Sequence, residues 1–325
     1  MPKRATIKSI AQDLGISHMT VSRALSDNPN VQKQTREVVR KRARELGYIR
    51  SAAAGAMRGD ASSIIGLIIP NITNDFYAHF ANQMAEACEA HGLQLIIHLT
   101  KDVYQAERLA INKLREIQAR AIAMVPTPVT DAAAVEEDPS IDIIQLIRQR
   151  DTGTAMPAVL VDDTKAIRDA ITHLRANGHD RIAYLGAPQT LSSGHARYRA
   201  YRQGLLDAGL AEDKALVFTA PPSLEMGESC AQKIIKDTDA TALMCGGFEI
   251  SYGALKCCIE QKVLNERIAF VGYGDPDFYS WIQGGVTTIK VPVEALAIKT
   301  VELVTDGAQP NRDQNYKFEA KFIAR

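Results

Sequence analysis

The chain has 325 residues, of which 46% are apolar and 23% charged, a composition typical of a water-soluble protein with more than one packed core. It contains no run of about 18 apolar residues, and its N-terminus lacks the apolar stretch of a secretory signal, so we expect a cytoplasmic protein with no membrane partner. The five cysteines include no C-x-x-C pair, which argues against a disulfide framework and against a bound metal.

The formal net charge is zero, but the charges are unevenly distributed along the chain. Residues 1–60 hold twelve Lys and Arg side chains against five Asp and Glu, which gives +7 and leaves −7 for the remainder. A basic segment on an otherwise acidic protein indicates a polyanionic partner, with a solvated charged tail as the alternative.

The spacing of apolar residues predicts three short helices, near residues 7–14, 18–25 and 32–46. Thr6 and Ser17 stand where a side-chain oxygen can cap the first two helices, and Gly15 can end the first. We expect the side chains that face inward to be Ile7, Ile10, Ala11, Leu14, Val21, Ala24, Leu25, Val31, Val38, Val39 and Leu46.

Two helices joined by a tight glycine turn form the helix-turn-helix pattern, whose second helix enters the major groove of DNA. On that second helix Arg23 can donate to guanine or phosphate, and His18 and Met19 can reach base edges or thymine methyl groups. An ordinary three-helix subdomain with a polar outer face is the alternative. The small polar residues suited to phosphate contacts are Thr6, Ser17, Thr20, Ser22 and Asn30.

From Ser62 onward short apolar runs alternate with helical patterns, which predicts parallel, doubly wound α/β sheets. The stretch is long for one such sheet, so we expect two lobes. The predicted strands are 64–70, 93–99, 121–125, 158–162, 181–186, 215–218, 242–245, 268–273 and 288–291. The predicted helices are 75–91, 106–117, 141–149, 164–177, 196–208, 223–236, 250–261 and 293–305.

Ligands of open α/β sheets bind beyond the carboxyl ends of the strands. The loops at those ends carry hydroxyl, carboxylate, amide and aromatic groups, a mixture that suits a polyol. Ordinary turn chemistry is the alternative for each of them. The candidate ligand-binding residues are Asn71, Asn74, Phe76, Tyr77, Thr127, Asp162, Ser193, Phe248 and Asp275.

Residues 6–48 read TIKSIAQDLGISHMTVSRALSDNPNVQKQTREVVRKRARELGY and resemble the headpiece of the LacI/GalR family of bacterial transcription regulators. The resemblance implies a hinge helix after the headpiece that folds on DNA and inserts an apolar side chain into the minor groove. Met57 aligns with that wedge. Arg50 replaces the usual proline, where it can add a phosphate contact, and Gly55 occupies an inner position of the hinge.

The stretches IGLIIPNITNDFYA, HLRANGHDRIAYLG and VGYGD resemble the core of the same family, which is similar to periplasmic sugar-binding proteins. The resemblance aligns the effector-contacting arginine of the family with Arg197. It also shows that Gly247 and Phe248 replace an Asn-Asp pair, so that Phe248 can stack on the ligand instead. The GYGD loop resembles that of the branch that senses gluconate-type sugar acids.

We therefore expect a helix-turn-helix domain at 1–48, a hinge at 49–61, and a two-lobed effector-binding and dimerisation domain at 62–325. The expected function is a homodimeric repressor that binds a palindromic operator under the control of a sugar or a sugar acid such as gluconate. The alternatives are a non-catalytic cytosolic sugar-binding protein and a regulator that senses a phosphosugar or a nucleobase. No P-loop, G-x-S-x-G, G-x-G-x-x-G or H-E-x-x-H motif is present, so we expect neither catalysis nor a cofactor.

Overall fold

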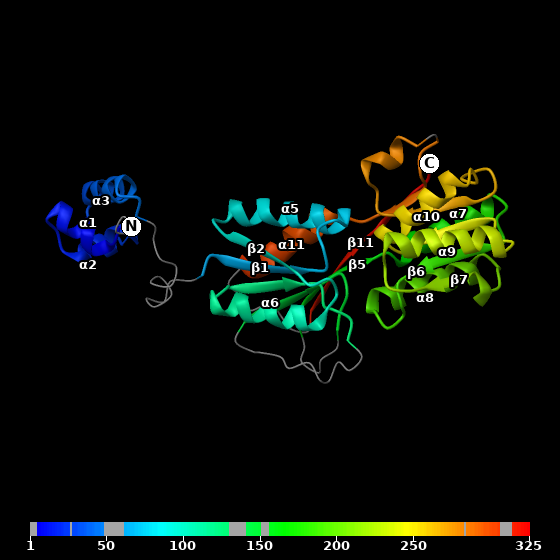
Figure 1. Cartoon of the computed structure of the whole chain (residues 1–325), viewed down its shortest axis with the longest axis horizontal. Coiled ribbons are helices and arrows are strands. Elements are labelled where there is room, and N and C mark those ends of the chain that lie inside the picture. Colours follow the sequence, from blue (N-terminus) through cyan, green and yellow to red (C-terminus); the bar gives the residue numbers. More distant parts are fainter. Residues whose placement is uncertain are drawn as a thin grey trace. The chain divides into compact units, whose positions relative to one another are not determined.

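The computed structural model describes residues 5–26, 28–48, 62–129, 141–150, 156–282, 284–305 and 314–325. The chain divides into two compact units, Met1–Ser62 and Ser63–Arg325 (Figure 1). The predicted hinge at 49–61 lies outside the described residues.

The described residues of the first unit form three helices, α1 (Ile7–Leu14), α2 (His18–Leu25) and α3 (Lys33–Glu45), as predicted. Thr6 caps α1 reciprocally with Ser9: its Oγ1 accepts from the Ser9 N–H at 3.1 Å, and the Ser9 Oγ accepts from the Thr6 N–H at 2.8 Å. Gly15 ends α1 in the left-handed region with φ 64°, and the Ser17 Oγ accepts from the Thr20 N–H at 3.0 Å to begin α2. These bonds satisfy backbone donors that a helix start leaves without a partner.

Ile10, Val21, Ala24 and Val39 form the solvent-inaccessible centre of this unit. The prediction that Val38 faces inward is wrong, because its neighbour Val39 occupies the core face and successive helical residues point about 100° apart. On the surface, α3 is tied to α1 by Arg42, whose Nε donates to the Asp13 Oδ2 at 2.8 Å.

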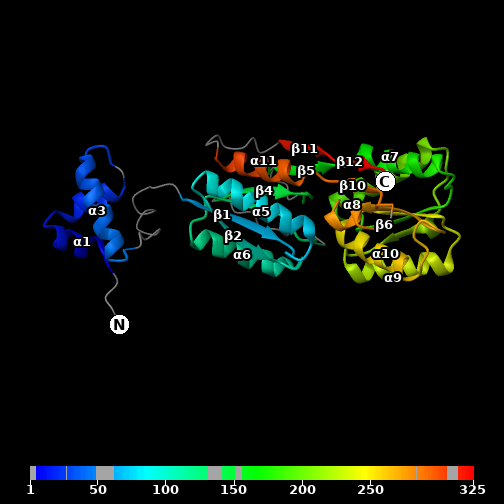
Figure 2. The same ribbon diagram turned by 90° about the horizontal axis from the view of Figure 1, so that it is seen from above.

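The second unit has two lobes, each built on a six-stranded sheet. The N-terminal lobe orders its strands β11-β5-β4-β3-β1-β2, with α5 and α11 on one face and α6 on the other (Figure 2). Its elements are β1 (Ile64–Ile69), α5 (Asp75–Ala90), β2 (Gln94–Leu99), α6 (Tyr104–Glu116), β3 (Ala121–Met124), β4 (Asp142–Leu146), β5 (Ala158–Asp162), α11 (Val293–Thr305) and β11 (Asn315–Glu319).

The C-terminal lobe orders its strands β12-β10-β9-β8-β6-β7, with the pair α7 and α8 on one face and the pair α9 and α10 on the other (Figure 2). Its elements are α7 (Thr164–Ala176), β6 (Ile182–Gly186), α8 (Ser192–Asp207), η2 (Lys214–Leu216), β7 (Val217–Thr219), α9 (Leu224–Asp237), β8 (Ala242–Cys245), α10 (Phe248–Glu260), β9 (Ala269–Tyr273), η3 (Asp277–Ser280), β10 (Thr288–Lys290) and β12 (Lys321–Ile323).

The predicted helix at 141–149 is wrong: β4 lies there, paired with β3 on one side and β5 on the other. A short apolar run has the same composition in a buried strand and in a buried helix, so periodicity does not separate the two. The strands β11 and β12 were not predicted. Because β12 runs antiparallel to β10, the C-terminal sheet is not purely parallel.

The chain passes between the lobes three times, from β5 to α7, from β10 to α11, and from β11 to β12. The first and third passages lie side by side, since β11 pairs in parallel with β5 up to Glu319 and Asp162 (Figure 1). The residues around these passages therefore determine how the two lobes are oriented relative to each other.

Helices α9 and α10 pack closely because each has a glycine at the contact. A Cβ atom on Gly253 would lie 1.9 Å from the Leu224 carbonyl oxygen, and one on Gly227 would lie 2.1 Å from the Ile250 carbonyl oxygen. Neither oxygen can move without a shift of a helix backbone.

We expect Gly253→Ala to lower the free energy of unfolding of this lobe by about 3 kcal/mol, because overpacking forces the two helices apart. Urea unfolding followed by circular dichroism measures the change. Glu260→Ala, at the exposed end of α10, is the control. An unchanged unfolding midpoint for Gly253→Ala would contradict the packing described here.

Candidate functional site

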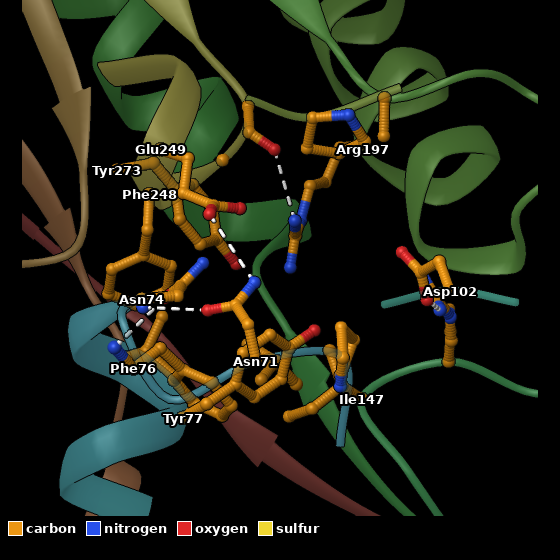
Figure 3. Close-up of a pocket in the computed structure, with 18 of the residues that line it drawn as sticks. Asn71, Asn74, Phe76, Tyr77, Asp102, Ile147, Arg197, Phe248, Glu249 and Tyr273 are labelled. Atoms are coloured by element: carbon orange, nitrogen blue, oxygen red, sulfur yellow. Dashed lines mark hydrogen bonds and ion pairs between the residues drawn. The ribbon is translucent and has the colours of Figure 1, made fainter. Parts of the chain in front are cut away.

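A cavity of about 300 Å³ lies between the two lobes of the second unit, at the carboxyl ends of their strands (Figure 3). The N-terminal lobe contributes the segment after β1, the turn after β2 and the end of β4. The C-terminal lobe contributes α8 and the segments after β8 and β9. Six of the ten predicted effector-binding residues line it: Asn71, Asn74, Phe76, Tyr77, Arg197 and Phe248.

Arg197 is the central cation of this pocket. Its Nε donates to the Asp163 Oδ2 at 2.6 Å and its Nη1 donates to the Gly246 carbonyl at 3.0 Å. The guanidinium carbon lies 4.1 Å from the centre of the Tyr273 ring, and the Tyr273 hydroxyl donates to the same Asp163 oxygen at 2.6 Å. Burial opposes the charge of Arg197, but Tyr273 and Asp163 outweigh it and hold the Arg197 pKa above its ordinary value. The guanidinium is thus fixed in place and keeps N–H donors for a ligand.

The start of α5 forms the opposite wall. The Asn74 Oδ1 caps α5 by accepting from the Phe76 N–H at 3.0 Å. The Asn71 Oδ1 accepts from the Asn74 N–H at 2.8 Å, which turns its Nδ2 toward the Glu249 Oε1, 3.5 Å away across the lobes (Figure 3). Phe76 meets Phe248 of the other lobe with ring centres 5.3 Å apart. Burial raises the pKa of Tyr77 to about 12, so its hydroxyl is a neutral donor near pH 7.

A second arginine, Arg148, lines the N-terminal side of the pocket and was not predicted, because its segment was predicted to be helical. Its Nε donates to the Pro126 carbonyl at 2.6 Å and its Nη2 forms an ion pair with Asp102. The preceding Ile147 has φ 66°, a left-handed conformation that is strained for a β-branched residue. Strain of this kind gathers at ligand sites, where surrounding contacts maintain it.

Four predicted effector-binding residues lie outside the pocket. Thr127 is buried, with its N–H donating to the Glu107 Oε2 at 2.6 Å. The Asp162 Oδ1 accepts from the Thr164 N–H at 3.2 Å, and it is the next residue, Asp163, that reaches Arg197. The Asp275 carboxylate is held by Lys290 at 3.3 Å and by Arg325 at 2.7 Å, and Ser193 is half-buried without lining the cavity.

Six of the ten predicted DNA-binding residues lie on α2 or cap its start: Ser17, His18, Met19, Thr20, Ser22 and Arg23. His18, Met19 and Arg23 are exposed on it, and 53% of Met19 is accessible to solvent, which is high for an apolar side chain. The hydroxyls of Ser17 and Thr20 lie 2.9 Å apart at its start. Thr6 and Asn30 are exposed and Ser22 is half-buried, whereas Arg50 and Met57 lie outside the described residues.

Over the described ranges, no three His, Cys, Asp or Glu side chains gather as metal ligands would. A search of the same residues finds no helix with the length and apolarity needed to cross a membrane.

We expect Asp163→Asn to destabilise the second unit by about 3 kcal/mol, because it leaves the buried Arg197 without a counter-charge. Asp162→Asn changes the same charge one residue away and should alter stability by less than about 0.5 kcal/mol. Chemical unfolding of the two variants side by side measures the difference, and equal effects would exclude Asp163 as the partner that holds Arg197.

Comparison with known proteins accounts for both units. Residues 6–51 match the family described as "Bacterial regulatory proteins, lacI family", and residues 62–321 match "Periplasmic binding proteins and sugar binding domain of LacI family". The chain is 24% identical over 310 residues to the transcriptional regulator GalS of Salmonella typhimurium, covering 95% of this chain and 91% of GalS. It is 25% identical over 307 residues to the repressor CytR of Escherichia coli, covering 94% and 90% of the two chains.

The fold is also that of solved structures. A lac repressor dimer bound to operator and the anti-inducer ONPF superposes with a TM-score of 0.84 at 21% identity, covering 99% of this chain and 98% of that one. The transcriptional regulator CelR in complex with cellobiose gives a TM-score of 0.72 at 21% identity, covering 99% of each chain. The chain belongs to the LacI family of bacterial DNA-binding transcriptional regulators.

Proposed function

We propose that this protein is a homodimeric repressor whose affinity for a palindromic operator is set by a small polyhydroxylated ligand bound between its two lobes. The observation that carries the proposal is Arg197, fixed by Asp163 and Tyr273 with donors left over, in a cavity that also has aromatic walls. Planar donors bind hydroxyl pairs, and aromatic rings cover the apolar face of a sugar ring. The lac repressor structure, a dimer on its operator, and the CelR complex with cellobiose support the same reading.

The GYGD loop predicts, more specifically, a sugar acid such as gluconate. That loop contributes Tyr273 to the pocket, whereas its carboxylate, Asp275, is engaged by Lys290 and Arg325 outside it. The Tyr273 hydroxyl already donates to Asp163, so the loop gives no support for a sugar acid, and we propose a sugar as the effector.

Two hydrogen bonds between the lobes suggest how effector binding changes the affinity for DNA. The Tyr252 hydroxyl donates to the Asp75 Oδ2 at 2.5 Å, and the Gln149 N–H donates to the Ser192 Oγ at 2.7 Å. A ligand that contacts both lobes adds to these bonds and favours the arrangement in which they form. The two lobes then have two arrangements, one with these bonds formed and one without them. Because the ligand shifts the populations of the two, operator affinity changes, as linkage requires.

Operator binding is tested with DNA that the protein selects from a random-sequence pool, and we expect the selected site to be palindromic. We expect Arg23→Ala to weaken binding about tenfold or more and to reduce the dependence of log affinity on log salt, because a contact to guanine or phosphate is lost. Lys165→Ala, an exposed change in α7, is the control. Sedimentation should show two chains on each operator. A site without two-fold symmetry, or one chain per site, would refute the dimeric mode.

Effector binding is tested by thermal shift with a panel of sugars, sugar acids and sugar phosphates. A ligand that binds the folded state raises the unfolding temperature by mass action. We expect Arg197→Lys, which keeps the charge but loses the planar fork, to abolish the shift, whereas Arg199→Lys on the exposed face of the same helix should leave it intact. If Arg197→Lys and Arg199→Lys gave the same shift, Arg197 would not be a ligand contact.

A further inference from the structure

The two arginines of the pocket already have counter-charges within the protein. Arg197 is paired with Asp163, whose side chain is almost fully buried, and Arg148 is paired with Asp102. Both cations therefore offer hydrogen-bond donors without offering net positive charge. The third basic side chain of the lining, Lys101, is exposed, so its charge is hydrated and screened.

Glu249 has no such compensation. It stands in the first turn of α10, and in Figure 3 its side chain shares the space between the lobes with Arg197 and Asn71. No Lys or Arg among the described residues pairs with it; its contacts are with the side-chain amides of Asn71 and Asn74. Burial raises its pKa, and the two amides partly offset that rise. The lining of the pocket thus holds one carboxylate that no described Lys or Arg pairs with.

An uncompensated carboxylate in a half-buried site discriminates between ligands by charge. It repels a carboxylate or phosphate, since like charges interact strongly where water is scarce, and it accepts hydrogen bonds from hydroxyl groups that would otherwise be lost to water. The apolar pair Phe76 and Phe248 beside it suits the face of a sugar ring and not an ionised group.

We propose that Glu249 determines effector specificity by selecting a polyhydroxylated ligand without an acidic group, whose hydroxyls donate to its carboxylate, and by excluding sugar acids and sugar phosphates. This inference rests on the proposed function and adds the charge class of the effector. Arg197 supplies donors to the ligand oxygens, and Glu249 supplies the acceptor on the same wall.

The test uses full-length protein and matched probes that differ in one acidic group: D-glucitol and D-gluconate, D-galactose and D-galacturonate, and D-ribose and D-ribose 5-phosphate. Titration calorimetry gives the dissociation constants for the unmodified chain, for Glu249→Gln and for Glu260→Gln. The last variant makes the same change at the exposed end of the same helix.

For the unmodified protein we expect at least one neutral probe to bind, and to bind about tenfold or more tightly than its acidic counterpart. Glu249→Gln should lower that ratio toward one by weakening the neutral probe and strengthening the acid, because the amide is neutral and can donate. Glu260→Gln should leave the ratio unchanged.

Tighter binding of an acid or a phosphate by the unmodified protein would overturn the inference, as would an unchanged ratio in Glu249→Gln. If operator binding persists in either case, the proposed regulator stands and only the charge class fails. If no probe binds, the effector control proposed above fails together with this inference.

Discussion

One buried carboxylate organises the space between the lobes. Asp163 stands on the first passage of the chain between them and accepts hydrogen bonds from both Arg197 and Tyr273. Removing ionised groups from water is costly, so such a pair contributes little net stability compared with apolar packing. Its effect is geometric: the same oxygen atom orients the guanidinium plane and the tyrosine ring, so these groups are preorganised on one wall of the pocket.

The N-terminal side repeats this arrangement with different residues. Arg148 is held by Asp102 and by the Pro126 carbonyl, and it follows a strained Ile147. Lys101 and Asp102 also have positive φ values, 52° and 58°. Three left-handed residues without glycine at one wall indicate that the backbone conformation is maintained by these contacts and not by local preference. The strained backbone is therefore held in a fixed conformation at this wall of the pocket.

Much of this structure could be predicted from local signals. Thr6 and Ser17 cap the helices where their side-chain chemistry indicates, and most strands follow apolar runs. What could not be predicted depends on partners distant in the sequence. The segment 142–146 is a strand because one strand on each side of it, β3 and β5, pairs with it. Asp163 and not Asp162 bonds to Arg197 of the pocket, a distinction of one residue that only the course of the chain into α7 decides. The role of Glu249 requires the opposite lobe, because Asn71 lies 178 positions away in the sequence.

The strand β1 has a mechanical consequence. It spans Ile64–Ile69 and begins two residues after the first unit ends. The residues that follow it, Pro70 and Asn71, line the pocket. Six residues of extended backbone form a rod of about 20 Å, clamped between β2 and β3 along its length. A strand paired on both sides bends little, so its two ends move together: a displacement of the pocket wall at Asn71 is accompanied by one at Ile64.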